Sequence, residues 1–145
     1  MVTATLPSVL ELTRQFLLGE ELVRREVESR IVTDEAPLAQ QKLGCVQLRQ
    51  QGMPRMERDL PLLRSRVKVV CVGPSRDKAE RIGRAVYAAL HGRSRTVVEQ
   101  PSDGSQYLIH YTQFVAGPSS GGAETEEIRD EALILELMVG TEALT

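Results

Sequence analysis

The chain has 145 residues, of which 41% are hydrophobic, enough to cover one modest core in a single domain spanning residues 1–145. No run approaches the roughly 18 apolar residues of a membrane span, and the N-terminus lacks the pattern of a signal peptide, so we expect a protein made in the cytoplasm with no membrane partner. The net charge of −2 by itself favours neither nucleic acid nor a membrane surface.

The first helix is expected from Pro7 to about Leu18, because apolar residues recur at helical spacing and proline suits the first turn. Residues 26–42 have mixed periodicity and contain a proline, which indicates a short extended piece and a loop. Residues 43–50 are expected to form a strand. The following segment, at about 50–63, holds one glycine and two prolines and is too long for a tight turn, so it is predicted to be a flexible loop.

The best-formed block is Arg64–Gly92, which indicates a buried strand, a Gly-Pro-Ser corner and an amphipathic helix capped by Ser75. Val70 and Val72 alternate with the core-facing residues, which suggests a central strand covered on both faces. The corner resembles a phosphate loop only superficially, because its spacing fits neither GxxxxGK[ST] nor GxGxxG. The block therefore carries scaffold and no catalytic signature.

Three strands are expected after this block, at 96–99, 106–115 and 131–139, and the segment at about 116–130 is predicted to be a flexible acidic loop. The order predicts an α+β fold in which a small, mostly antiparallel sheet is packed by two α-helices. The sheet face opposite the helices would keep a second apolar surface, for which another subunit is the simplest cover. Its members would be Val70, Val72, Leu108, Phe114, Ile134 and Met138.

No catalytic, cofactor-binding or metal-binding residue is predicted, and no enzyme. Cys45 and Cys71 sit inside predicted strands, which favours two buried thiols over a disulfide or a metal pair. His91 and His110 have no partner in a nucleophile arrangement. A hard cation could be collected by Glu126, Glu127, Asp130 and Glu131, although a flexible acidic loop is more often simply solvated.

Charge is unevenly distributed along the chain. Residues 1–41, 42–95 and 96–145 carry about −3, +9 and −8. This segregation indicates either two solvated faces or a head-to-tail interface, in which the basic surface of one subunit meets the acidic surface of the next. The candidate interface residues are Arg55, Arg58, Arg64, Arg76, Arg81, Arg84, Glu124, Glu126, Glu127, Asp130 and Glu131.

Four segments together carry a family resemblance: FLLGEEL, IVTDEAP, CVQLRQQG and RVKVVCVGPSRDKAERIGRAVYAALHG. From about Leu6 to Val139 the chain resembles the tail terminator and tail-completion proteins of long-tailed bacteriophages. The resemblance implies a structural virion protein that forms a ring, expected to be six-fold, at the head-proximal end of the tail tube. Its implied partners are further copies of itself, the tail tube protein and the connector proteins of the neck, with DNA passing through only as cargo.

Two alternatives remain open. Head-completion and connector proteins of the phage neck are similar in size and shape. A small nucleic-acid-binding module using the +9 middle segment is the competing class, and phosphate contacts would give it a steep dependence on salt.

Overall fold

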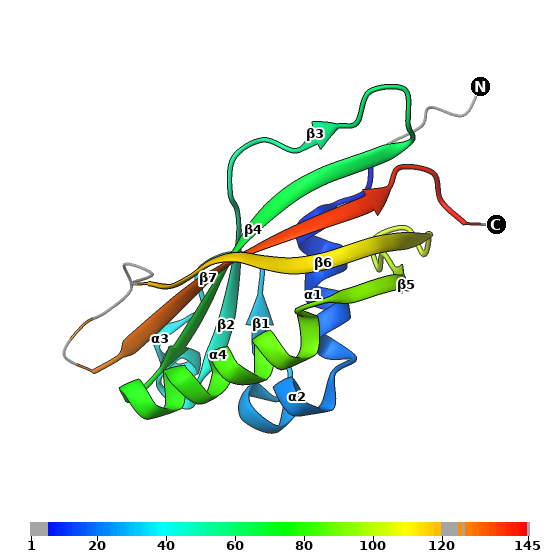
Figure 1. The fold of residues 1–145 in the computed structure, drawn as a ribbon. Coiled ribbons are helices and arrows are strands. Elements are labelled where there is room, and N and C mark those ends of the chain that lie inside the picture. The colour runs from blue at the N-terminus through cyan, green and yellow to red at the C-terminus, as the bar shows by residue number, and fades with distance from the viewer. Residues whose placement is uncertain (1–5, 120–124, 126, 145) are drawn as a thin grey trace.

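The computed structural model describes residues 6–119, 125 and 127–144, and its described part is built around one seven-stranded sheet in the order β1-β2-β4-β7-β6-β5 (Figure 1). The strands are β1 Ile31–Val32, β2 Cys45–Gln50, β3 Arg55–Met56, β4 Leu62–Gly73, β5 Arg93–Glu99, β6 Gln106–Ser119 and β7 Arg129–Gly140. Only β1 and β2 pair in parallel, and β3 pairs with β4 beside the main path. The prediction of a mostly antiparallel α+β sheet is therefore confirmed.

Four helices occur where two were predicted: α1 Val9–Leu18, α2 Glu21–Val27, α3 Leu38–Leu43 and α4 Arg76–Leu90. The chain breaks at Gly19 before α2 begins. The prediction of a loop at 38–42 is wrong. Helix α3 has six residues and buries only Gln41, whose side-chain amide donates to the carbonyl of Ala36 at 2.7 Å, so it shows no apolar stripe. None of the helices in the described ranges is long and apolar enough to cross a membrane.

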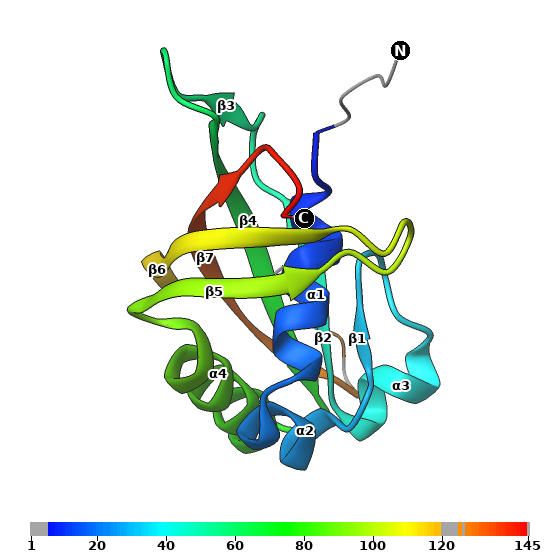
Figure 2. The same cartoon turned by 90° about the vertical axis from the view of Figure 1, so that its right-hand side faces the viewer.

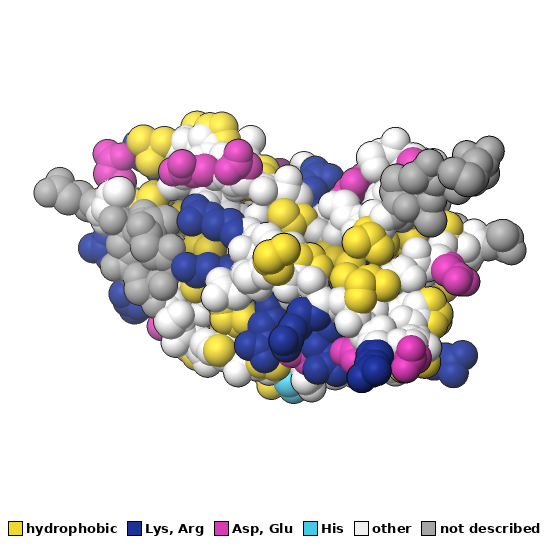
Figure 3. Space-filling view, turned by 90° about the horizontal axis from the view of Figure 1, so that it is seen from above, with side chains coloured by type: hydrophobic (Ala, Val, Ile, Leu, Met, Phe, Trp, Pro, Cys, Tyr) yellow, Lys and Arg dark blue, Asp and Glu magenta, His cyan; other side chains and the backbone are white. Residues whose placement is uncertain are grey.

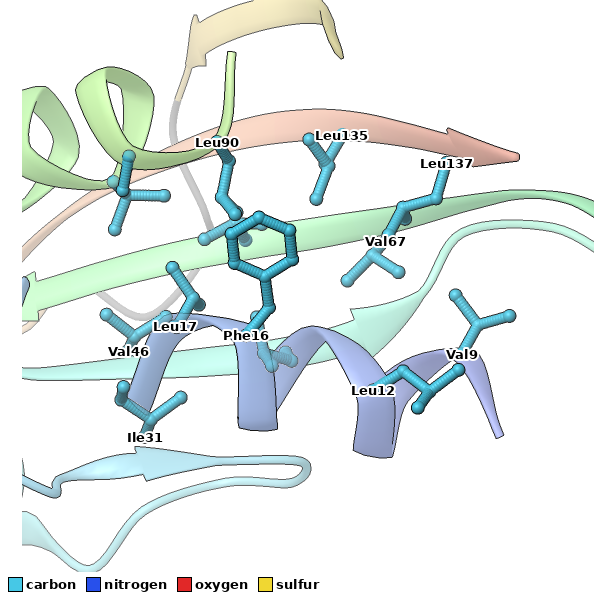
Figure 4. Packing of buried hydrophobic residues seen from close by; sticks show 14 of the residues in the cluster. Val9, Leu12, Phe16, Leu17, Ile31, Val46, Val67, Leu90, Leu135 and Leu137 are labelled. Atoms are coloured by element: carbon cyan, nitrogen blue, oxygen red, sulfur yellow. The ribbon is translucent and has the colours of Figure 1, made fainter. Parts of the chain in front are cut away.

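The main core lies between the helices and one face of the sheet, which curls around α1 (Figures 1 and 2). Figure 4 shows Phe16 and Leu17 of α1 pointing toward the strands, where Val67 of β4 and Leu135 of β7 face them. The predicted inward row Val67, Val69 and Cys71 on β4 is confirmed, because all three are fully buried in this cluster.

A second, smaller cluster covers one end of the opposite sheet face, and its members are Ala36, Cys45, Val70, Val72, Ile128 and Ala132. The segment before α3 and the segment before β7 supply the cover, and Lys42 ties them together through an ion pair with Glu127 at 3.0 Å. The expectation that another subunit covers Val70 and Val72 is therefore wrong, because the chain covers them itself. Phe114 packs against the main core and is not on this face.

Two predicted loops are more regular than expected. The segment after Gln50 contains β3 and returns along β4, so residues 51–61 form an arm that projects from one end of the sheet (Figure 1). At the other end, β6 runs to Ser119 and pairs there with Ala132 of β7. Residues 116–119, 129 and 130 are thus strand, which corrects the predicted loop at 116–130.

The two cysteines are buried free thiols. They lie on neighbouring strands, since Cys45 is opposite Val72 and Cys71 is opposite Val46. Because consecutive strand residues point to opposite faces, Cys71 faces the main core and Cys45 the smaller cluster. The sheet therefore separates the two sulfur atoms.

Candidate interaction surfaces

A hollow of about 480 Å³ lies between α4 and the far ends of β6 and β7. It is lined by Arg76, Glu80, Arg84, Pro118, Ser119, Asp130 and Glu131. Four of the eleven candidate interface residues thus meet inside one chain, two of them basic and two acidic. Part of the charge segregation seen in the sequence is neutralised here without a second subunit.

Glu131 is the most constrained charge in this hollow. Its side chain faces α4, because residue 131 pairs with the core-facing Cys71. Burial and the nearby Glu80 raise the pKa of Glu131, and the guanidinium groups of Arg84 and Arg76 act in the opposite direction. The hollow is therefore a mixed-charge site with a partly desolvated carboxyl at its wall.

A second, more apolar hollow of about 320 Å³ continues along α4 and shares Pro118 with the first. Its other lining residues are Tyr87, Phe114, Val115, Ala116, Gly117 and Leu133. The rings of Tyr87 and His91 stack with centroids 4.5 Å apart, and Phe114 lies 5.5 Å from Tyr87. We call the two hollows together the α4 groove. The apolar half of the groove was not predicted, because its only local signal in the sequence is the i, i+4 spacing of Tyr87 and His91.

The arm and its base carry three further basic candidates, Arg55, Arg58 and Arg64. Arg64 at its base pairs with Glu57 at 3.1 Å, and Arg58 lies 3.9 Å from Asp59 with both side chains almost fully exposed. Apolar side chains are exposed beside them: Met53 is 87% exposed, and Met56 and Leu60 each more than half. An exposed apolar cluster on a projecting arm is typical of an interaction surface.

The arm and the α4 groove lie at opposite ends of β4. In the strand register, Arg55 of β3 lies opposite Arg64 near the start of β4, and Asp130 of β7 lies opposite Val72 near its end. Arg64 and Val72 are eight residue steps apart along the strand, which corresponds to about 27 Å. Glu127 lies at the groove end through its ion pair with Lys42, while Glu124 and Glu126 fall outside the described residues.

The arginines on the exposed side of α4 have local partners. Arg81 pairs with Asp77 at 3.2 Å and Arg84 with Glu80 at 3.5 Å, both one helical turn apart. Exposed pairs of this kind contribute about 0–1 kcal/mol each. Neither pair prevents the guanidinium group from also meeting an external carboxylate.

The Gly-Pro-Ser corner is filled by the chain itself. Ser75 Oγ accepts a hydrogen bond from the amide of Lys78, and a Cβ at Gly73 would lie 2.8 Å from Lys78 Cγ. Lys78 Nζ in turn donates to a carboxylate oxygen and to the carbonyl oxygen of Glu26, each at 2.8 Å. Residues of this corner thus serve to join α4 to α2.

Neither histidine belongs to a catalytic arrangement within the described ranges. His91 Nδ1 accepts a hydrogen bond from the amide of Phe114, and His110 lies on β6 at the rim of an apolar hollow. Among the described residues no group of three or more histidine, cysteine or acidic side chains could hold a metal ion.

Comparison with solved structures identifies the fold. A chain from the virion of a native gene transfer agent particle superposes with a TM-score of 0.67 at 14% sequence identity, covering 92% of this chain and 95% of that chain. A second solved chain gives a TM-score of 0.50, also at 14% identity, covering 95% and 98%. No family model and no curated protein matches the sequence. The shared property is the fold, over nearly the full length of both chains.

Proposed function

We propose that this protein is a non-enzymatic structural component of a phage-like virion, and that it forms the ring that ends the tail tube on the side of the head. The observation that carries the proposal is the fold shared with a gene transfer agent virion chain over 92% of this sequence. The sequence resemblance to tail terminators, which rests on different information, points to the same class of particle.

The ring contact that we propose joins the arm of one subunit to the α4 groove of the next. These surfaces differ from one another, and the mixed-charge half of the groove lies about 27 Å from the arm along β4, so the contact is heterologous. A heterologous contact closes into a ring when the rotation between neighbours is a simple fraction of a turn. Six subunits are the number that the family resemblance implies.

Apolar contacts would supply most of the affinity. The arm exposes Met53 and Met56, and the apolar half of the groove exposes Tyr87 and Val115. Methionine adapts to irregular surfaces and makes favourable contacts with aromatic rings. Fully burying such side chains contributes about 1.5–3 kcal/mol each, whereas exposed ion pairs add about 0–1 kcal/mol.

Charge would set the orientation of the contact. Arg55 and Arg58 lie on the arm, and Glu80 and Glu131 line the mixed-charge half of the groove. Glu127, which pairs with Lys42, adds a further carboxylate at the groove end of the chain. Complementary charges of this kind steer association and exclude wrong registers more than they tighten binding.

Electron microscopy of the purified protein, alone and mixed with tail tubes, tests the function. Six-fold rings that cap one end of the tubes are expected. A twelve-fold ring that binds portals would instead assign the protein to the neck as a connector. A protein that stays monomeric at high concentration and binds neither tail tubes nor portals would contradict the proposal.

Mass photometry of variants tests the contact. Met53→Asp on the arm and Tyr87→Asp in the groove should each abolish rings, because each places an uncompensated charge in an apolar contact. Val97→Asp is the matched control, since Val97 is also about half exposed but lies on β5 outside both surfaces. Rings that survive both test substitutions would place the contact elsewhere.

A further inference from the structure

A row of basic side chains crosses the sheet face that the helices leave uncovered. Arg49 of β2 lies directly opposite Lys68 of β4, and Lys68, Arg66 and Arg64 follow one another on the same side of β4 at every second residue. We call these four residues the basic row. Figure 3 shows this face from above, with lysine and arginine side chains gathered around a central apolar area.

The strand pairing in the basic row is electrostatically unfavourable for an isolated subunit. Like charges placed directly opposite one another on neighbouring strands are destabilising. Arg49 and Lys68 are both partly buried, and within the described part of the chain neither forms an ion pair with a carboxylate. Arg49 instead donates to Gln47 Oε1 at 3.0 Å. By contrast, the similarly buried Lys78 is paired with Glu26.

The same kind of conflict recurs at the arm end of the face, where Arg55 lies opposite Arg64. Arg55, Arg64 and Arg66 line a hollow of about 290 Å³ together with Gln51, Met53, Ser65 and Glu136. The two nearby carboxylates are already engaged: Glu57 pairs with Arg64, and Glu136 accepts from Arg66 at 3.2 Å and from the hydroxyl of Tyr111 at 2.8 Å. Positive charge therefore remains in excess on the part of the face between Lys68 and the arm.

We infer that this face binds the sugar–phosphate backbone of DNA. A nucleic acid strand presents a regular series of anions, and the basic row presents cations about 6.7 Å apart along β4, with arginine forks that match phosphate oxygens. Tyr111 is held by Glu136 and is not free to stack on a base. The contact is thus independent of base sequence and belongs to the single subunit, so it goes beyond ring formation.

Fluorescence anisotropy with a labelled 30-base-pair duplex tests the inference. We expect a dissociation constant near the non-specific range of about 10⁻⁴–10⁻⁶ M, the same for two unrelated sequences. Each neutralised phosphate contributes about −0.9 to the slope of log K against log salt, so three or four contacts predict a slope of about −3. The double variant Arg49→Glu/Lys68→Glu should lose at least tenfold in affinity.

The matched control is Arg24→Glu/Arg25→Glu on α2, which makes the same change in net charge on an exposed helix. It should bind DNA nearly as well as the wild type. Equal losses in both double variants, or no binding by the wild type at 50 mM salt, would overturn the inference. So would a polyglutamate chain that displaces DNA at equal charge concentration, because the face would then suit an acidic protein.

Two further measurements separate this inference from the ring proposal and from a merely structural role. Arg49→Glu/Lys68→Glu should still form rings, while Tyr87→Asp, which lies on α4 away from this face, should lose rings and keep DNA binding in the single subunit. Lys68→Met should raise the urea midpoint by relieving repulsion and yet weaken DNA binding, whereas Lys68→Arg should retain both wild-type properties. A Lys68→Met variant that binds DNA normally would contradict the site.

Discussion

The carboxylate of Glu131 packs against the backbone of α4 at Gly83. A Cβ atom on residue 83 would lie 3.2 Å from Glu131 Oε1 and 3.3 Å from its Cδ. The absence of a side chain therefore lets the helix approach β7 closely, and this closeness removes part of the solvent from the carboxylate. One glycine thus helps to shape the wall of the α4 groove.

Stability should depend on pH through Glu131. Burial and Glu80 raise its pKa in the folded state, so the favourable contribution of the protonated form is present below the unfolded pKa and is lost as pH rises through the folded value. Replacing Glu131 by glutamine removes this titration. The variant should gain stability relative to the wild type as pH rises from 4 to 8, measured by urea unfolding at each pH.

Glu99→Gln is the control for that measurement, because it removes one negative charge from an exposed position on β5. The difference in the free energy of unfolding between Glu131→Gln and the wild type could instead stay constant or shrink as pH rises. That result would show that attraction to Arg84 and Arg76 outweighs the desolvation of Glu131.

Strand β4, helix α4 and strand β7 could be predicted from the sequence because each has a strong local period. The predicted helix capped by Ser75 is confirmed, with its hydroxyl accepting from the amide of Lys78. Helix α3 could not be predicted, because its six residues bury only one polar side chain and carry no apolar period.

The candidate surfaces depend on sheet order, which local patterns do not contain. The sequence has a basic middle segment and an acidic C-terminal segment, but it does not show that β7 lies beside β4 and under α4. That arrangement brings Arg76 and Glu131 into one hollow and leaves Arg55 at the far end of the sheet. Likewise, the opposition of Arg49 and Lys68 is visible only once the register of β2 and β4 is known.

The link between α2 and α4 should depend on Lys78. Its side chain and that of Glu26 are only 18% and 22% exposed, and Lys78 Nζ also donates to the carbonyl of Glu26. Replacing Lys78 by methionine should lower the free energy of unfolding by about 1–2 kcal/mol at pH 7, because it leaves partly buried acceptors unpaired. Chemical denaturation gives this difference directly.

The same substitution should have a pH signature. The hydrogen bond from Lys78 outweighs burial and lowers the pKa of Glu26, so the wild type carries stability above the unfolded pKa that is lost as pH falls through the folded value. The difference in the free energy of unfolding between the wild type and Lys78→Met should become smaller below about pH 4.5. Arg25→Met, which removes an exposed pair with Glu21, is the control and should cost at most about 0.5 kcal/mol.

The contact of α1 with the sheet should dominate the stability of the domain. Leu12 is fully buried in the main core, so Leu12→Ala should lower the free energy of unfolding by about 2–5 kcal/mol through lost burial and a residual cavity. Leu22→Ala, at a half-exposed position on α2, should cost much less. Similar losses for the two variants would mean that α1 is not packed as described.

The two cysteines should be inert toward thiol reagents until the protein unfolds. Burial raises the pKa of Cys45 to about 11 and raises that of Cys71 further, so at pH 8 almost no thiolate is available on either side of the sheet. The reaction with a chromogenic disulfide should therefore be slow in buffer. In denaturant it should release two equivalents of the chromophore per chain. Ser94→Cys, at an exposed position on β5, should add one fast equivalent and calibrates the reagent. Rapid modification of a wild-type thiol would instead reveal local opening of β2 or of the small cluster in which Cys45 packs with Ala36 and Ile128.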